Sequence, residues 1–451
     1  MQNVGWQPWT LNGGVAGLAG RGLRIEALQV KIVERGSDVP LAEGTYFISP
    51  AKNAARALKP ASSAKGVRSV AATFADNLYE RYYLRDEGNG MVSLQSVFSG
   101  LFLAKKNGAI VQLPDSSRAT HRWQLSSWKG GYVLQNARDD KAVAFVGGKA
   151  ALRAKGTRLV FTGTQLLPNG NYRLRNLQGN SWLNIGGMSY KLGDNAEVAA
   201  LGDMRRQVFI FTNKGADNFE IKNAYSYQAL DVMNGSSASG TNVRQWEFNN
   251  SAAQTWKAAL SRKGGFTFTN KASGTVLTAG GSARAGNNVS ANTAADARNQ
   301  CWLLAPSGYA GNPAIPRAAA MIRDLSSKTN YAIAYDLTNH WLCVFQGSRG
   351  NWTMIKTWII SHGKASNPSP RGTFETRRRT PRSYGGSTIW YYTHFRGDNA
   401  FHSIKFKRDS MTAVNDGRLG KEISYGCVRM ELPNAKFIYD LPLGTLVRGY
   451  K

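Results

Sequence analysis

The chain has 451 residues, and because a single hydrophobic core stops growing at about 250–300 residues, we expect three or four modules. Hydrophobic residues make up 42% of the chain and charged residues 19%, which is ordinary for globular domains and excludes a largely disordered protein. The formal net charge of +29 points to an anionic partner.

Two kinds of anionic partner fit this charge. A nucleic-acid partner would use it on phosphates, but the sequence has no helix-turn-helix, RRM or zinc-finger pattern, so we expect no nucleic acid. Cell-wall glycan or anionic wall polymers are the other kind. The basic run at residues 377–382 is interpreted as a solvated face, with a specific substrate contact as the alternative. No stretch of about 18 apolar residues exists, so we also expect no membrane span.

The N-terminal segment carries a spaced pattern of tryptophan, glycine and charged residues. The pattern comprises Gly5, Trp6, Trp9, Gly17, Gly20, Arg24, Glu26 and Ala27. It resembles the second half of a ChW repeat, the tryptophan-bearing surface repeat of Gram-positive bacteria, so residues 1–38 are interpreted as a partial repeat. The resemblance implies a secreted or cell-wall-associated protein, with the export signal upstream of Met1.

Short alternating runs, 48 glycines and no long helical periodicity before Pro313 predict mostly β structure. Residues 41–163 show a faint threefold repeat whose units close at Tyr82, Trp123 and Phe161. We interpret it as a divergent β-trefoil, and one irregular β-sandwich is the alternative.

A clearer threefold repeat fills residues 166–306, and such periods decide architecture before other signals. Each unit opens with an aromatic strand and closes with a Gln-x-aromatic or Gln-x-Trp element. The opening residues are Tyr172, Phe219 and Phe266, and the closing glutamines are Gln207, Gln254 and Gln300. This order resembles a ricin-type β-trefoil lectin, in which three units share a core that no single unit could bury.

The lectin resemblance implies a sugar site only in the middle unit. That unit has Asp231 after its first strand, Trp246 as a stacking aromatic and Gln254 nearby, whereas the other units have Asn184 and Thr278 in the Asp place. Because the closing glutamines recur in every unit, Gln254 is first a residue of the fold. A module that keeps the fold as a spacer without binding sugar is therefore the alternative.

Residues 307–328 are predicted to be a linker. Pro313 and Pro316 mark the exit from the repeat, and residues 317–325 are the only good helix former in the chain. A short connecting helix is therefore expected before the last domain, at residues 329–451.

The three cysteines, Cys301, Cys343 and Cys427, cannot all pair within one chain, and none has metal-ligand spacing. We expect no disulfide framework, no metal and no organic cofactor. Cys301 and Cys343 lie in strand-like apolar runs, where a thiol acts as a small hydrophobe. Cys427 instead follows Gly426 in a small polar segment, which is the setting of a nucleophile.

A thiol nucleophile needs a base, and His402 lies one loop upstream on a strand-like segment. Three further patterns precede it in order: a hairpin at residues 331–345, Ser361 to Lys364, and Asn367 to Phe374. Together with the Ser-Tyr-Gly-Cys segment at residues 424–427, they resemble the catalytic domain of L,D-transpeptidases. The implied fold is a β-rich domain with few short helices, which makes the whole chain mainly β and multidomain.

The resemblance implies ping-pong acyl transfer between peptidoglycan stem peptides. His402 would take the proton of Cys427, whose thiolate attacks the donor, and the backbone N–H groups of Gly426 and Cys427 would hold the oxyanion. Ser403 would orient the imidazole, through its backbone carbonyl. His394 and His362 are the next candidates for the base.

Two positions leave alternatives open. The family usually has His where this chain has Tyr425, which is expected to fix the turn before Gly426. Arg429 is spaced to meet a donor carboxylate, and a structural ion pair is its alternative. The rival functions are a carbohydrate-binding surface protein with a decayed catalytic domain, which Tyr425 favours, and an L,D-carboxypeptidase, which releases the acyl group to water.

Overall fold

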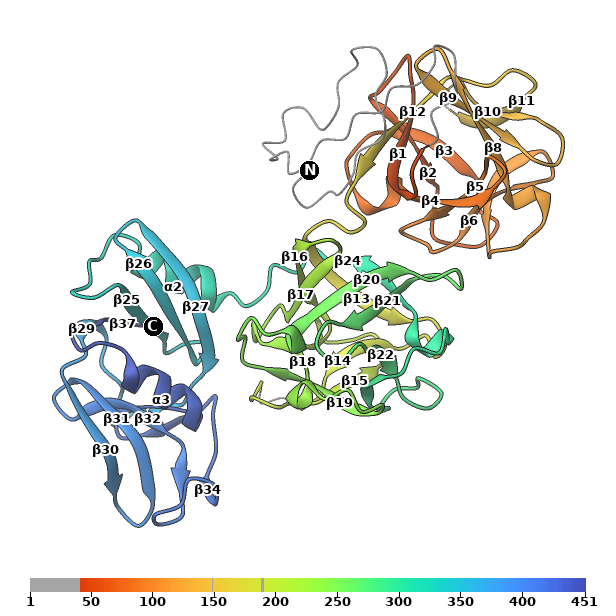
Figure 1. The fold of residues 1–451 in the computed structure, drawn as a ribbon. Coiled ribbons are helices and arrows are strands. Elements are labelled where there is room, and N and C mark those ends of the chain that lie inside the picture. Colours follow the sequence, from red (N-terminus) through yellow and green to blue (C-terminus); the bar gives the residue numbers. More distant parts are fainter. Residues whose placement is uncertain (1–40, 148, 188–189) are drawn as a thin grey trace.

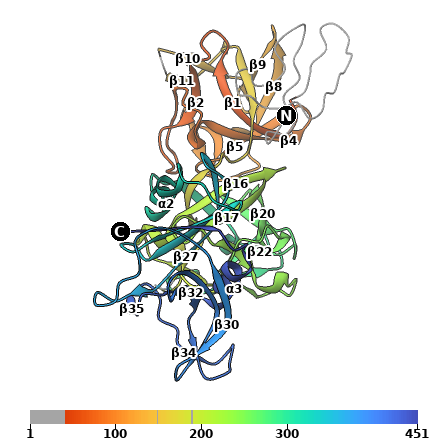
Figure 2. The same ribbon diagram turned by 90° about the vertical axis from the view of Figure 1, so that its left-hand side faces the viewer.

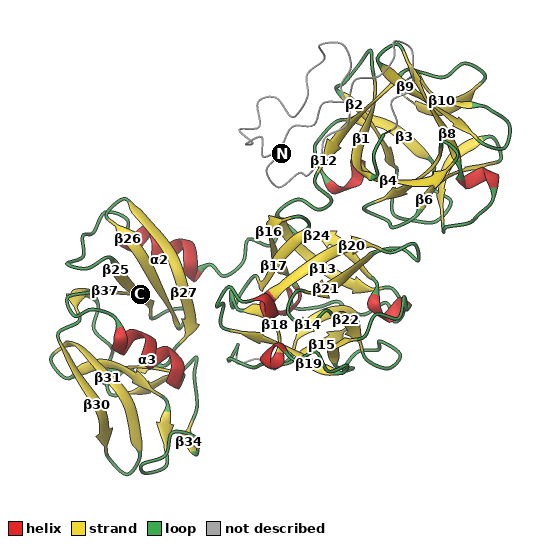
Figure 3. Ribbon diagram, in the orientation of Figure 1, coloured by secondary structure: helices red, strands yellow, loops and turns green. Residues whose placement is uncertain are grey.

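The computed structural model describes residues 41–147, 149–187 and 190–451, and the ChW interpretation of residues 1–38 lies outside them. The described residues form 37 β-strands, three α-helices and five short 3-10 helices (Figure 3). The prediction of a mainly β, multidomain chain is therefore confirmed. None of the helices in the described ranges is long and apolar enough to cross a membrane.

The first twelve strands form a closed barrel with three hairpins. Neighbours pair in the ring β1–β4–β5–β8–β9–β12, and β12 returns to β1. Strands β2 and β3, β6 and β7, and β10 and β11 form the hairpins. Six barrel strands with one hairpin per third are the arrangement of a β-trefoil and not of an irregular sandwich. The strands are β1 (Gly44–Pro50), β2 (Arg56–Pro60), β3 (Ser69–Thr73), β4 (Arg81–Gly88), β5 (Met91–Ser96), β6 (Phe102–Lys106), β7 (Ala109–Leu113), β8 (Trp123–Trp128), β9 (Gly131–Asn136), β10 (Ala142–Val146), β11 (Lys149–Arg153) and β12 (Leu159–Thr164).

The next twelve strands repeat this plan. The ring is β13–β16–β17–β20–β21–β24, which closes back on β13, and the hairpins are β14–β15, β18–β19 and β22–β23. The strands are β13 (Gly170–Asn176), β14 (Trp182–Ile185), β15 (Ala196–Ala199), β16 (Phe209–Gly215), β17 (Asn218–Asn223), β18 (Ala229–Val232), β19 (Thr241–Trp246), β20 (Thr255–Leu260), β21 (Phe266–Asn270), β22 (Val276–Ala279), β23 (Val289–Asn292) and β24 (Trp302–Pro306), with the one-turn helix α1 (Met204–Gln207) before β16.

The repeated glutamines hold each unit of the second trefoil together. The Oε1 atoms of Gln207, Gln254 and Gln300 accept a backbone N–H five residues upstream at 2.8–2.9 Å. Their Nε2 atoms donate to a carbonyl seven residues upstream at 2.7–2.8 Å. All three side chains are buried, so these bonds satisfy polar groups that water cannot reach. The Gln-x-aromatic pattern is thus first a structural device.

The two trefoils are packed against each other (Figures 1 and 2). Leu78 and Val97 of the first trefoil are buried within the core cluster of the second. Arg262 of the second trefoil forms ion pairs with Glu87 at 2.9 Å and Asp115 at 3.1 Å in the first.

The C-terminal domain combines a five-stranded sheet, β27–β26–β25–β37–β29, with a sheet ordered β34–β33–β31–β32–β36, in which β30 also pairs with β31. The short strands β28 and β35 pair with each other. Helix α2 packs on the first sheet, and α3 contacts β31 and β32. The elements are α2 (Ala314–Ile322), β25 (Tyr331–Asp336), β26 (Trp341–Ser348), β27 (Asn351–Ile359), β28 (His362–Gly363), β29 (Gly372–Glu375), β30 (Arg378–Tyr384), β31 (Thr388–Arg396), β32 (Asn399–Ser403), β33 (Lys405–Phe406), β34 (Val414–Asp416), β35 (Glu422–Ser424), β36 (Val428–Met430), α3 (Leu432–Asp440) and β37 (Leu446–Tyr450).

The helix prediction needs two corrections. The connecting helix begins at Ala314 and ends at Ile322, whereas residues 317–325 were expected. It can begin before Pro316 because a proline is tolerated in the first turn of a helix. Few short helices were expected in the C-terminal domain, but the position of helix α3 was not predicted. It begins at Leu432 with Pro433 in its first turn and buries Ala435 and Ile438 against the sheet, so tertiary packing rather than intrinsic helix propensity stabilises it.

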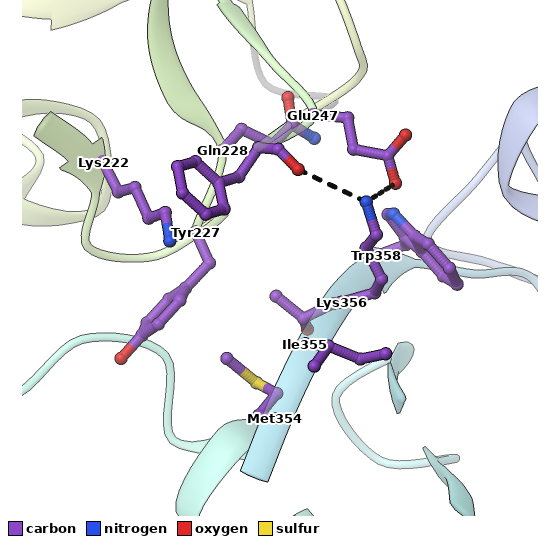
Figure 4. Close-up of a pocket in the computed structure, with 10 residues that line it drawn as sticks. Lys222, Tyr227, Gln228, Glu247, Met354, Ile355, Lys356 and Trp358 are labelled. Carbon is purple, nitrogen blue, oxygen red and sulfur yellow. Dashed lines mark hydrogen bonds and ion pairs between the residues drawn. The ribbon is translucent and has the colours of Figure 1, made fainter. Parts of the chain in front are cut away.

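The second trefoil contacts the C-terminal domain through aromatic residues and one ion pair. Tyr190 and Tyr225 of the trefoil cluster with Trp341 of β26. Lys356 of β27 reaches across to Glu247, with 2.8 Å between Nζ and Oε1, and also donates to the carbonyl of Phe248 (Figure 4).

Candidate functional site

Parallel pairing of β32 with β36 brings the two halves of the proposed active site together. Phe401 is opposite Val428, and His402 is opposite Arg429. Cys427 immediately precedes β36 and therefore lies beside Ala400, whose backbone hydrogen-bonds to the thiol. The loop between His402 and Ser424 begins and ends where β32 and β36 pair, so its length does not move His402 away from Cys427.

The Cys427 thiol is partly exposed and has three polar neighbours. Its Sγ lies 3.0 Å from the Tyr392 hydroxyl and 3.7 Å from the Asp398 carbonyl oxygen. The third neighbour is the backbone of Ala400. Burial raises the pKa of the Cys427 thiol above its ordinary value, although the bonds from Tyr392 and Ala400 oppose this. The thiol is therefore protonated at neutral pH and needs a base before it can attack.

His402 is fully enclosed and held in one orientation. Its Nδ1 lies 2.6 Å from the Ser403 carbonyl oxygen, so Nδ1 carries the proton and Nε2 is the basic nitrogen. Its ring stacks on Tyr392 with centroids 5.1 Å apart and planes at 4°. Burial lowers the pKa of His402 to about 4, which keeps the imidazole neutral at physiological pH.

The Tyr392 ring lies between the two groups that the sequence singled out. The thiol hydrogen-bonds to its hydroxyl, and no bond joins the thiol to His402 in the described part of the chain. Hydrogen bonds of catalytic pairs are often long before substrate binds, so this geometry is compatible with His402 as the base. Tyr392 was not predicted, because an aromatic in an alternating strand gives no sign in the sequence that its hydroxyl meets a thiol.

The turn before Cys427 requires glycine. Gly426 has φ +102°, and a Cβ there would lie 2.3 Å from Asn399 Nδ2. The Gly426 carbonyl accepts a bond from the Ser369 hydroxyl at 2.8 Å, and the Cys427 carbonyl accepts one from the Ser424 hydroxyl at 2.6 Å. The Gly426 N–H donates to Ser424 Oγ at 3.3 Å, so an oxyanion would compete with that bond.

Ser369 is a second residue that the sequence did not single out. Its Oγ accepts the Gly363 N–H at 3.0 Å while donating to Gly426. Through this hydroxyl, two motifs that are far apart in sequence fix the position of the nucleophile turn. Its place inside the Asn367-to-Phe374 motif was the available signal.

Tyr425 and Arg429 flank the turn without contacting the thiol. Tyr425 is 75% exposed, and its ring carries Lys364 Nζ at 4.2 Å from the centroid. Arg429 is 3% exposed, and its Nη1 lies 2.9 Å from Asp416 Oδ2. Bonds from Arg418 and Arg429 hold the pKa of Asp416 well below its usual range. This is the geometry of a structural ion pair, and the Arg429 guanidinium has little surface to offer a substrate.

Ser403 contributes through both its backbone and its side chain. Besides the carbonyl that accepts from His402, its Oγ donates to the Ile404 carbonyl at 2.6 Å and accepts the Trp390 N–H at 2.9 Å. Of the other two histidines considered as the base, His394 lies beside Tyr392, with ring centroids 4.9 Å apart, and His362 does not contact the thiol. His362 places its ring nitrogens against the carbonyls of Leu337 and Gly363.

The proposed sugar site is filled by the chain's own arginine. Arg244 Nε donates to Asp231 Oδ1 at 3.2 Å, and its guanidinium lies 3.9 Å from the ring centroid of Trp246. Gln254 Nε2 lies 3.2 Å from the other Asp231 oxygen. A sugar that stacks on Trp246 and bonds to Asp231 would therefore have to displace Arg244.

The other two cysteines, Cys301 and Cys343, are both buried. Burial raises the pKa of the Cys301 and Cys343 thiols, as expected for small hydrophobes. Within the described residues, no group of three or more His, Cys, Asp or Glu side chains could hold a metal ion.

The chain is a modular protein: two β-trefoils precede a β-rich domain in which a cysteine, a histidine and a tyrosine form one cluster. Three family models match segments of it. Residues 330–448 match the L,D-transpeptidase catalytic domain, residues 160–246 and 252–358 match the ricin-type beta-trefoil lectin domain-like family, and residues 1–34 match the Clostridial hydrophobic W (ChW) family. The three resemblances are thereby confirmed.

Individual relatives cover parts of the chain. The candidate L,D-transpeptidase YciB of Bacillus subtilis (strain 168) is 26% identical over 102 residues, which are 21% of this chain and 52% of that protein. The chain thus spans about half the length of the curated relative it matches.

Two solved structures are similar to parts of the chain. One is a fused Zn-dependent amidase/peptidase/peptidoglycan-binding domain-containing protein from Clostridium acetobutylicum ATCC 824. It is 33% identical, with 30% of this chain and 59% of that chain covered and a TM-score of 0.26. The other is the designed 3-fold symmetric protein ThreeFoil, at 24% identity, with 31% of this chain and 99% of that chain covered and a TM-score of 0.30.

Proposed function

We propose that this protein is a cell-wall L,D-transpeptidase that transfers an acyl group from a donor stem peptide to an acceptor amine through a thioester on Cys427. The observation that carries the proposal is the partly exposed Cys427 thiol, which contacts the Tyr392 hydroxyl while the Tyr392 ring stacks on the neutral, oriented imidazole of His402, in a domain that matches the L,D-transpeptidase family. Peptidoglycan is the substrate that this family match suggests.

The first half-reaction forms the thioester. His402 Nε2 takes the thiol proton, and Sγ of Cys427 attacks the carbonyl carbon of the donor amide. The negative charge on the carbonyl oxygen is stabilised by backbone N–H groups at the turn, that of Cys427 first, because the Gly426 N–H already donates to Ser424. The C–N bond then breaks, and the imidazolium returns its proton to the amine of the expelled D-residue.

The second half-reaction restores the thiol. An acceptor amine attacks the thioester carbonyl, its surplus proton passes to His402, and the C–S bond breaks to leave a new amide. Water in place of the amine would give an L,D-carboxypeptidase. Intact Cys427, His402 and Gly426 support an active enzyme over a decayed one, since Tyr425 faces solvent and takes no part in the thiol's hydrogen bonding.

We further propose that the trefoils and the N-terminal ChW segment hold the enzyme at the wall, where glycan and anionic polymers would meet its net charge of +29. Sugar binding at Asp231 and Trp246 requires Arg244 to move. The Arg244→Ala variant is therefore expected to bind wall glycan more tightly than the natural chain at this site.

Release of the terminal D-amino acid from a tetrapeptide donor tests the catalytic proposal. The natural chain should release it, and supply of an acceptor stem should convert the donor to a cross-linked dimer. The Cys427→Ala variant should do neither. Release without any cross-link at saturating acceptor would favour the carboxypeptidase.

A further inference from the structure

The antiparallel ribbon of β30 and β31 forms one wall of the Cys427 site. Its register pairs Arg378 with His394, Thr380 with Tyr392, and Arg382 with Trp390. Because side chains alternate between the faces of a strand, these three pairs lie on one face of the ribbon. Tyr392 in that row contacts the Cys427 thiol, so the whole row belongs to the face that meets the nucleophile.

A continuous series of contacts runs along this row from Arg378 to the thiol. Arg378 Nη2 lies 3.3 Å from His394 Nε2, and the His394 and Tyr392 rings are 4.9 Å apart between centroids. The Tyr392 hydroxyl is 3.0 Å from Sγ. A guanidinium therefore lies two side chains away from the group that attacks the donor.

Among the described residues Arg378 has no anionic partner, whereas two other arginines near the site each have one. Arg429 pairs with Asp416, Arg382 pairs with Asp409, and Arg379 donates to the Leu441 carbonyl. Arg378 is exposed, and its guanidinium lies against the His394 ring. Burial and the charge of Arg378 lower the pKa of His394, so the guanidinium faces a neutral ring.

We propose that Arg378 is the anion subsite of the active site and binds a carboxylate that the donor peptide carries next to its scissile amide. The proposal rests on the proposed function and names the group by which this site would recognise its donor. A planar guanidinium binds carboxylate through two parallel hydrogen bonds, which a lysine cannot reproduce. Successive residues are about 3.8 Å apart, so a carboxylate on the expelled residue, or on the residue before it, lies close to the attacked carbonyl. Arg378 takes the carboxylate-binding role that was one of the two alternatives for Arg429.

Matched donors test the subsite. One pair carries either a free carboxylate or a carboxamide at the terminal D-residue, and a second pair makes the same exchange on the side chain of the residue before it. The kcat/KM of donor consumption is measured for the natural chain, Arg378→Gln, Arg378→Lys and Arg377→Gln. The last is the control, since it removes the same charge from the exposed residue immediately before β30.

The natural chain and Arg377→Gln should prefer the carboxylate over the carboxamide by about 10- to 100-fold in one of the two pairs, the usual worth of a hydrogen-bonded charge. Arg378→Gln should lose that preference by slowing only the carboxylate donor, and Arg378→Lys should keep part of it. The pair that responds identifies which carboxylate is bound. Equal slowing of all four donors by Arg378→Gln, or an unchanged preference, would overturn the subsite. Failure of the natural chain to consume any donor would instead overturn the proposed function.

Discussion

At the scale of single residues, the neutrality of His402 determines how the enzyme should respond to pH. A buried imidazole with a pKa of about 4 is ready to accept a proton at any pH above that value. Because burial raises the pKa of the Cys427 thiol, little free thiolate forms at a pH below the ordinary pKa of a thiol. General-base catalysis by a neutral pair then gives a broad plateau of rate between the two pKa values.

We predict that the rate of thioester formation stays level from about pH 8 down to about pH 5 and falls only as the pH approaches 4. A pH series of single-turnover acylation measures this directly. An acidic limb centred near pH 6.5, the ordinary histidine value, would show that the base is a solvent-exposed imidazole or that His402 opens to water before reaction.

The same burial has a consequence for folding. In the unfolded chain His402 takes a proton below about pH 6.5, whereas in the folded chain it does so only near pH 4, so stability is full above the unfolded value and is lost as the pH falls through this window. We predict that this residue accounts for about 2–3 kcal/mol of the loss between pH 7.5 and 4.5. Urea unfolding of His402→Gln at both pH values measures it. If the variant loses as much stability as the natural chain, His402 is not the group responsible.

The two tyrosines near the nucleophile should behave differently when the hydroxyl is removed. Tyr392→Phe deletes the 3.0 Å contact to Sγ and should slow acylation by about tenfold, since one hydrogen bond is worth about 1–1.5 kcal/mol. Tyr425 is 75% exposed, so Tyr425→Phe should change the rate of acylation by less than about threefold. Tyr425→His should raise that rate by less than about tenfold. Rates of adduct formation at Cys427 decide this. A gain of several hundredfold in Tyr425→His would mean that the chain is a degenerate enzyme. A carbohydrate-binding surface protein with a decayed catalytic domain would then be the better interpretation.

At the scale of elements, the loop that leads from His402 to Cys427 is anchored by the pair of Asp416 and Arg429. Asp416→Asn would leave a 3%-exposed guanidinium without its anionic partner. We predict a loss of about 2–3 kcal/mol in the stability of the C-terminal domain, towards the lower end for buried pairs because Asp416 itself is partly exposed. Arg418→Gln removes a surface partner of the same carboxylate and should cost less than about 1 kcal/mol. Equal losses in the two variants, measured by denaturant unfolding, would contradict a buried pair.

The elements that the sequence predicted well are those with strong local signals. The hairpin of β25 and β26 follows from apolar alternation on both sides of a turn, in which His340 has a positive φ. Helix α3 and the contact of Tyr392 with the thiol depend on packing between distant segments, and a run such as 432–440 has weak intrinsic helix propensity. Spacing alone could not show whether Arg378 or Arg429 is available to bind a carboxylate, because both are arginines near the motifs. Only the position of Asp416, which pairs with Arg429, distinguishes the two.

At the scale of the whole molecule, the second trefoil had a clear sequence signal, because its units repeat the same buried polar and aromatic positions. Trp256 and Trp302 each donate an indole N–H to a leucine carbonyl at 2.9 Å and 3.0 Å, and Trp123 of the first trefoil does so at 3.0 Å. The contacts between modules carry no such repeat. Arg244 in the proposed sugar site and Arg262 between the trefoils are therefore visible only in the folded chain.

The aromatic contact between the second trefoil and the C-terminal domain should hold the two together. Tyr225→Ala removes one ring, whose centroid lies 4.7 Å from that of Tyr190 in the same trefoil and 5.4 Å from that of Trp341 in the C-terminal domain, each such pair being worth about 0.5–1.5 kcal/mol. We predict faster proteolytic cleavage in the segment between β24 and α2, with each module still folded. Leu201→Ala, at a 56%-exposed position, is the control and should leave cleavage unchanged. An unchanged cleavage rate in Tyr225→Ala would mean that the aromatic cluster does not restrain the domains.

Formation of the thioester on Cys427 is the central step of the proposed function. Exposure of the natural chain to a carbapenem, followed by intact-mass analysis and peptide mapping, tests it most directly, with Cys427→Ala as the control. We predict one adduct, mapped to Cys427, no adduct on the buried Cys301 or Cys343, and none in the variant. An adduct on another residue, no adduct at all, or release of the donor's terminal D-residue by Cys427→Ala would contradict the account.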